Sequence, residues 1–128
     1  MELPGGRSDV ASLTKIGAEA ANLIKEQNYK GLADRFGYAL ARNVDPANAI
    51  QADVDACLSR GWAVARSLMM CSPTIAVKYF EPNEIGLFAE IECALPLAHK
   101  AGCLMADLIV TTTVGGMRIF LEQIRYAA

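Results

Sequence analysis

The amino-acid sequence predicts a single α+β domain, spanning residues 1–128, in which N-terminal helices pack on a small antiparallel sheet with a C-terminal β-hairpin. Two observations support this prediction. Helical periodicity is confined to the first half of the chain, and runs of β-branched and aromatic residues fill much of the second half. The length is typical of one domain, and 53% of the residues are hydrophobic against 20% charged, so we expect a packed core.

The first helix is expected to start at Ser8, whose hydroxyl can accept a hydrogen bond from a free backbone amide, and to end at Asn28. Between these residues a stripe with spacings of three and four predicts one buried face. The stripe consists of Val10, Leu13, Ile16, Ala20, Leu23, Ile24 and Gln27. A second, shorter helix should follow, and its apolar stripe consists of Leu32, Phe36, Ala39 and Leu40.

The third helix has a clear start signal. Asp45 can accept hydrogen bonds from the first free amides, and Pro46 suits the first helical position, where its missing N–H costs nothing. The helix should run to about Arg60, and Gly61 is expected to end it in a left-handed conformation. The following segment, 62–71, fits several periods and is open between strand and helix.

Strands are expected in the second half. Residues 74–80 are rich in β-branched and aromatic side chains and follow the Ser72-Pro73 break, which predicts a strand. Two further runs of this type, 108–114 and 117–122, are separated by Gly115-Gly116, a connection that permits the positive φ of a tight hairpin turn. We therefore predict a β-hairpin over residues 108–122 that turns at the two glycines.

The segment 83–95 is ambiguous between helix and strand. A strand would place Glu90 and Glu92 together on an exposed face. Asn83 as a helix cap, and the content of Ala, Leu and Glu, favour a helix instead, which Pro96 would kink or end. On these propensities we expect the helix. The apolar residues that alternate as in a strand are Leu87, Ala89, Ile91, Cys93 and Leu95.

Negative charge is concentrated in one short stretch. The segment 81–92 contains Glu81, Glu84, Glu90 and Glu92 and no lysine or arginine, while the whole chain has a formal net charge of −2. The chain has no basic run of the kind that binds a phosphate backbone, so direct nucleic-acid binding is not expected. An acidic patch instead favours the encounter with a basic protein partner.

Few side chains offer catalytic or metal-binding chemistry. The four cysteines form no C-x-x-C pair, so we interpret them as buried thiols and expect neither a metal site nor a cofactor. The single histidine, His99, could meet Cys103 on a helix as base and thiol, but Gly102 opposes that helix. We therefore expect no catalytic residue. The cysteines are Cys57, Cys71, Cys93 and Cys103.

The carboxylate pairs Asp53/Asp55 and Glu90/Glu92 could act as general acid and base if the fold brought them across a cleft. Residues two apart share a face on a strand but not on a helix. Since Asp and Glu are rarely buried without a partner, a solvated acidic surface is the favoured interpretation.

The N-terminal residues lack the cationic start and the apolar run of a signal peptide. The most apolar stretch, 94–110, is interrupted by His99, Lys100 and Asp107, and it is shorter than the roughly 20 apolar residues that a bilayer span requires. We therefore expect a cytoplasmic protein without a membrane-spanning segment.

Three segments, together with the size and charge pattern, resemble small bacterial immunity proteins, including those of contact-dependent growth inhibition systems. The segments are Phe36-Gly-Tyr-Ala-Leu-Ala41, Asp45-Pro46-Ala47 and Phe80-Glu-Pro-Asn83. The resemblance implies a cytoplasmic protein that binds and neutralises a cognate toxin, often a nuclease such as a tRNase or DNase, without turnover. The acidic residues expected to face this basic partner are Glu81, Glu84, Glu90 and Glu92, with Asp53 and Asp55 as weaker candidates.

The alternative function is that of a small-ligand-binding or enzymatic α+β domain with a pocket between helix and sheet, as in cystatin-like or nuclear-transport-factor-like folds. Tyr79, Phe88 and Asp107 would line that pocket. The high hydrophobic content also leaves apolar residues for a homodimer interface. Fold class alone does not decide between these functions.

Overall fold

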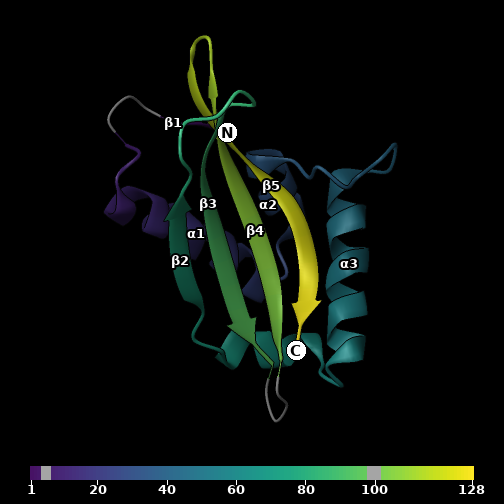
Figure 1. Ribbon diagram of the computed structural model, residues 1–128. Helices are drawn as coiled ribbons and strands as arrows, with labels where there is room; N and C mark the ends of the chain where they lie inside the picture. Colours follow the sequence, from purple (N-terminus) through teal and green to yellow (C-terminus); the bar gives the residue numbers. More distant parts are fainter. Residues whose placement is uncertain (4–6, 98–101) are drawn as a thin grey trace.

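A computed structural model describes residues 1–3, 7–97 and 102–128 of the chain (Figure 1). Three α-helices and one short 3₁₀ helix, η1, come before four of the five strands. The elements are β1 (Glu2–Leu3), α1 (Val10–Lys25), α2 (Tyr29–Phe36), α3 (Pro46–Arg60), η1 (Ala65–Met70), β2 (Thr74–Tyr79), β3 (Leu87–Pro96), β4 (Cys103–Thr113) and β5 (Gly116–Ala127).

The strands form one sheet in the order β1-β5-β4-β3-β2, and every neighbouring pair is antiparallel. The helices lie on one side of this sheet, with α1 behind β2 and β3 and α3 beside β5, so that no described helix lies over the other face (Figure 1). The α+β prediction is confirmed. No helix among the described residues is long and apolar enough to cross a bilayer.

The core lies between the helices and the sheet because β3 alternates strictly. Ala89, Ile91, Cys93 and Leu95 are fully buried, while the residues between them face away from the helices. Helix α1 approaches closely at Gly17, where an added Cβ would lie 2.7 Å from Ile75 Cγ2 and 2.8 Å from Ile91 Cγ2. A larger residue at Gly17 would therefore push α1 away from the sheet.

The boundaries of the first two helices differ from the prediction. Asp9, not Ser8, caps α1, because its carboxylate accepts a hydrogen bond from the Ser12 amide. Asn28 does not end α1; it caps α2 by accepting from the Gly31 amide. The second stripe was predicted too long, since α2 ends at Phe36, before Ala39 and Leu40.

Helix α3 starts and ends as predicted, with the Asp45 carboxylate accepting from the Asn48 amide. The predicted conformation of its stop is wrong: Gly61 has a φ of −86°, and the left-handed residue is Trp62, with a φ of 54°. Glycine is favoured at position 61 because a side chain would clash with Leu97: an added Cβ at Gly61 would lie 2.2 Å from Leu97 Cδ1. The ambiguous segment 62–71 contains η1.

The helix expected within 83–95 is wrong, because residues 87–96 form β3 between β2 and β4. Pairing on both sides and burial of the alternating apolar face outweigh the helix propensity of Ala, Leu and Glu. Asn83 caps no helix. Its side chain instead closes the β2–β3 loop, donating to the carbonyls of Glu81 and Leu87 and accepting from the Leu87 amide. Pro96 is the last residue of β3.

The C-terminal hairpin is confirmed, but its turn lies one residue earlier than predicted. Thr113 pairs with Gly116, so Val114 and Gly115 form the turn. Of the two glycines only Gly116 has a positive φ, 141°, and Gly115 is not left-handed. Either glycine could adopt a positive φ without steric cost, so the sequence alone did not show which of the two adopts it.

The outer edge of β5 is sealed by segments from the N-terminal half. The amide and carbonyl of Ile119 bond to Met1, and the carbonyl of Leu121 accepts from the Ala39 amide. Farther along, the Tyr38 hydroxyl accepts from the Ile124 amide at 3.1 Å and donates to the Asp53 carboxylate at 2.5 Å. Burial, followed by the bond to Asp53, raises the pKa of Tyr38. Tyr38 therefore joins α3 to the sheet edge.

Replacing Gly116 by Ala should lower the free energy of unfolding by about 1–3 kcal/mol, the cost of holding a non-glycine residue at such a φ. Replacing Gly115 by Ala should change it by less than about 0.5 kcal/mol, since nothing lies within 4 Å of the added methyl. Urea denaturation of both variants measures the difference. Equal losses from the two substitutions would contradict the assignment of the turn.

Replacing Tyr38 by Phe should destabilise the fold by about 1–3 kcal/mol, because the buried Ile124 amide loses its acceptor. The matched control is Tyr79→Phe, which removes an exposed hydroxyl that donates to the Ser8 carbonyl and should cost less than about 1 kcal/mol. Chemical denaturation of the two variants provides the comparison. If Tyr38→Phe costs no more than the control, the hydroxyl does not seal the edge.

Candidate functional site

The uncovered face of the sheet holds a row of polar and charged side chains at its centre. Cross-strand pairing places Glu92 of β3 beside Asp107 of β4, and Asp107 beside Gln123 of β5. Glu90 precedes Glu92 by two residues and therefore lies on the same face. The strand alternative thus holds for these two glutamates, which the structure brings together with residues 107 and 123.

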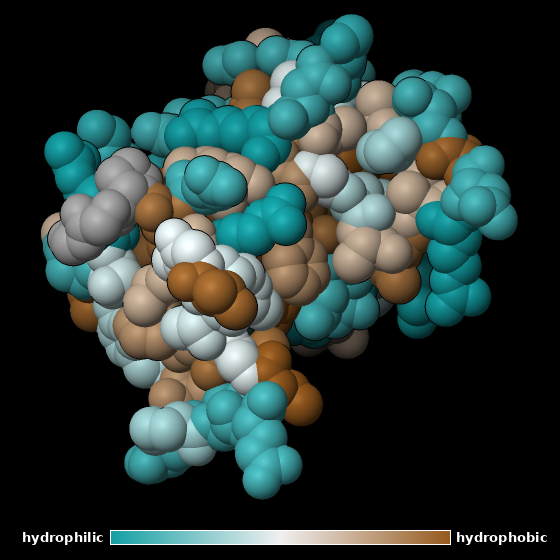
Figure 2. Space-filling view, turned by 90° about the horizontal axis from the view of Figure 1, so that it is seen from above, coloured by the Kyte–Doolittle hydropathy of each residue, from teal (hydrophilic) through white to brown (hydrophobic). Residues whose placement is uncertain are grey.

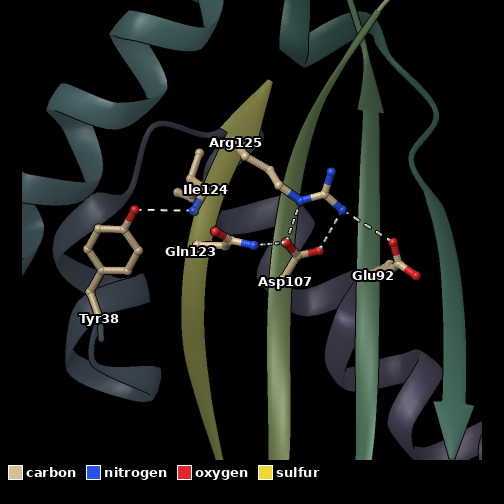
Figure 3. Close-up of polar contacts among 6 residues, drawn as sticks. All are labelled: Tyr38, Glu92, Asp107, Gln123, Ile124 and Arg125. Carbon is tan, nitrogen blue, oxygen red and sulfur yellow. Dashed lines mark hydrogen bonds and ion pairs between the residues drawn. The ribbon is translucent and has the colours of Figure 1, made fainter. Parts of the chain in front are cut away.

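Asp107 is the centre of this group and is only 1% exposed. Arg125 Nε donates to Asp107 Oδ2 at 2.7 Å, and Gln123 Nε2 donates to the same oxygen at 3.0 Å (Figure 3). Arg125 Nη2 lies 3.4 Å from both Asp107 Oδ1 and Glu92 Oε2. A buried carboxylate requires such compensation, because removal from water is costly for an unpaired charge.

A β-bulge shapes the site. Asp107 pairs with Gln123 but Leu108 pairs with Leu121, so Glu122 is an extra residue in β5. Bulges bend a strand locally and redirect side chains. The bulge therefore lets Leu121 face the helices while Gln123 and Arg125 face Asp107 on the opposite side. Sequence analysis missed Gln123 and Arg125, and the available signal was Asp107 itself, a single charge within the apolar run 104–110.

Glu90 differs from Glu92 and Asp107 because no hydrogen bond or ion pair among the described residues involves its carboxylate. Burial is the largest cause that raises the pKa of Glu90, and the nearby carboxylates of Asp107, Glu92 and Glu122 raise it further. Lys78 acts in the opposite direction but is outweighed. The pKa of Arg125 is raised, first by its hydrogen bond to Asp107. Glu90 thus lies among other carboxylates without a direct partner of its own among the described residues.

Glu90, Glu92 and Asp107 offer carboxylate oxygens within 4.8 Å of one another, a donor set that hard divalent cations accept. Arg125 already supplies positive charge at this position through its contacts with Asp107 and Glu92. A cation would have to displace the guanidinium, and we assign none to the cluster.

The remaining acidic candidates lie elsewhere. Glu81 and Glu84 are exposed in the β2–β3 loop, near the tip of the β4–β5 hairpin, since Gly86 of that loop bonds to Thr112. Asp53 and Asp55 lie on α3 in the helix layer, where Asp53 is engaged by Tyr38 and Asp55 is exposed. The two carboxylate pairs therefore do not face each other across a cleft.

The end of the molecule that includes the hairpin tip and the β2–β3 loop exposes isolated apolar residues. Ile85 is 76% exposed, and Val114 at the tip is fully exposed. Seen from this end, strongly hydrophobic residues appear as separate brown spots among teal hydrophilic ones (Figure 2). Single exposed apolar residues of this kind are common and indicate no patch by themselves.

Of the three residues proposed for a ligand pocket, two are in contact and the third has other partners. Tyr79 packs edge-on against Phe88 with ring centroids 5.5 Å apart, whereas Asp107 is held by Arg125 and Gln123. The four cysteines are free thiols: Cys57 and Cys93 are buried, and Cys71 and Cys103 are half-buried. His99, and with it the His99–Cys103 arrangement, lies outside the described residues.

Replacing Glu90 by Gln should raise the free energy of unfolding at pH 7 by about 0.5 kcal/mol, a surface-scale value because Glu90 is only partly buried. A folded-state pKa above the unfolded one makes wild-type stability fall as pH rises from about 4.5 through the folded pKa. The two proteins should therefore converge below that window. Urea titrations at several pH values test this, with Glu84→Gln in the exposed loop as control. A less stable Glu90→Gln at pH 7 would contradict it.

No protein-family model, curated protein or solved structure matches this chain. The features that bear on function are the geometry and charge of the uncovered sheet face and the sequence itself.

Proposed function

We propose that this protein binds a basic protein partner stoichiometrically through the uncovered, acidic face of its sheet, and that the partner is a cognate toxin domain which the protein neutralises in the cytoplasm. The observation that supports this most is the excess of carboxylates on a face without helices. Around Glu90, the described carboxylates of Glu92, Asp107 and Glu122 lie near two cations, Lys78 and Arg125.

The arrangement of charge suits recognition. Arg125 fixes Asp107 and Glu92, so these carboxylates are held in place before a partner arrives. Glu90 has no direct partner and is disfavoured as a charged group by its surroundings, so a lysine or arginine from a partner would relieve that unfavourable interaction. Glu81 and Glu84 extend the negative potential to the hairpin end of the sheet.

The proposal of an inhibitor rather than an enzyme follows from the same contacts. Asp107, the most buried charge on this face, accepts hydrogen bonds from Arg125 and Gln123, which hold its carboxylate in one position. A carboxylate that is fixed and covered in this way suits a static electrostatic anchor better than a group that exchanges protons with a substrate. The identification of the partner as a nuclease toxin, such as a tRNase or DNase, rests on the resemblance to immunity proteins. A nuclease offers a cationic surface that an acidic face complements.

The proposal predicts a toxin gene directly upstream, and the C-terminal domain of that toxin is the probe. Reversing Glu84 or Glu90 to Lys should slow its association severalfold at about 0.05 M salt, and the difference should shrink toward 1 M as the screening length falls to about 3 Å. Surface plasmon resonance measures both rates. Glu90→Lys should also speed dissociation, because residue 90 is partly buried on the proposed face.

Glu26→Lys is the matched control, since it makes the same change in charge at an exposed residue at the end of α1. It should leave both rates within about twofold of wild type if the effect is local. Protection of cells that produce the toxin domain should follow the same order. Equal effects of all three reversals, or association indifferent to salt, would remove the support for this face.

A further inference from the structure

The backbone groups at the two edges of the sheet differ in their hydrogen bonding to the rest of the chain. Along β5, backbone groups are satisfied by Met1, Ala39 and the Tyr38 hydroxyl. Along the outer edge of β2 no hydrogen bond joins the backbone to any other described residue. Figure 1 shows β2 at the left margin of the sheet, with β3 on one side and no strand on its outer side.

The pairing with β3 fixes which groups of β2 point outward. Phe80 donates its amide to the Phe88 carbonyl, so this position and every second residue before it bond inward to β3. The intervening residues, Ile75, Val77 and Tyr79, therefore direct three amides and three carbonyls away from the sheet. This is a complete template for one additional antiparallel strand.

Most of the features that protect exposed edges are missing from β2. Its six residues contain no proline, and its register with β3 has no bulge. Lys78 is its only charge, and its side chain lies on the uncovered face. On the helix side the edge is flanked by apolar surface, because Tyr79 is 41% exposed and Val10 57% exposed. The Tyr79 hydroxyl bonds to the Ser8 carbonyl, which places the start of α1 beside it.

We propose that β2 pairs antiparallel with β2 of a second copy of this chain about a twofold axis at Val77, which joins the two sheets into one. In this register Val77 lies opposite Val77 of the second copy, and Ile75 lies opposite Tyr79. Three pairs of outward-facing residues then exchange six backbone hydrogen bonds. This proposal is independent of the toxin-binding function.

The side chains of β2 complement themselves in this register. On the helix side the pairs are Val–Val and Ile–Tyr, combinations of β-branched and aromatic residues that stabilise antiparallel strands. On the uncovered face Ala76 lies opposite Lys78 of the second copy. Each Lys78 stays beside Glu90 of its own β3 and packs 5.7 Å from the Phe80 ring, which limits repulsion between the two lysines.

Neighbouring symmetric registers are less favourable. A shift toward the start of β2 that centres the axis on Ala76 places Tyr79 opposite Pro73, which has no amide to donate. A shift the other way, centred on Lys78, sets the two lysines directly opposite each other. The Val77-centred register is thus self-complementary, which favours a second copy of this chain over a strand from a different protein.

Sedimentation equilibrium of the full chain between about 1 and 100 µM tests the proposal. Ala76→Glu should strengthen the dimer about tenfold, because it faces Lys78 of the second copy twice per dimer, and Ala76→Lys should weaken it by a similar factor. Combining Ala76→Lys with Lys78→Glu should restore association by exchanging the two charges.

Folding and association respond in opposite directions, which separates them. Within one chain Ala76 lies beside Glu92, so Ala76→Lys should make the monomer more resistant to urea than Ala76→Glu. The proposal is wrong if the wild-type chain is monomeric at 100 µM. It is also wrong if the dimer dissociation constant is the same for the wild type and the three variants. It also fails if these variants alter toxin-domain binding while the chain remains monomeric, because the edge then belongs to the toxin.

Discussion

The described α-helices all pack on the same face of the sheet, and the rest of the structure follows from this constraint. One face of β3 can be wholly apolar because α1 packs on it. The other face, which no described helix covers, has charged side chains around the buried Asp107 at its centre. This central group also gives the face several carboxylates.

The position of Asp107 shows how such a face is made stable. A carboxylate that is 1% exposed needs donors on the same side of the sheet, and the bulge in β5 supplies them by turning Gln123 and Arg125 toward it. Replacing the group by apolar residues would be a simpler way to stabilise the strands. An uncovered apolar face, however, would promote non-specific association. The ion-pair network therefore allows a charged residue to be buried at the centre of the sheet.

Local signals predicted the elements whose causes are local. Asp45 and Pro46 start α3 because capping involves only the next few residues, and the hairpin was visible because its strands are consecutive. The strand β3 was not predictable from propensity, since the pairing that decides it involves β2 and β4 on either side. The site was half predictable for the same reason: Glu90 and Glu92 stand together in the sequence, whereas Arg125 is 18 residues from Asp107.

The close approach at Gly17 has a further consequence for how α1 sits on the sheet. Successive residues of a helix point about 100° apart, so moving α1 by one residue along its axis would replace the glycine with Ile16 or Ala18 at the narrowest contact. Neither side chain fits beside Ile75 and Ile91 at that separation. Gly17 thus restricts α1 to one rotation and one axial position on the sheet. The start of the helix is held on the same side of the sheet by the hydrogen bond from the Tyr79 hydroxyl to the Ser8 carbonyl.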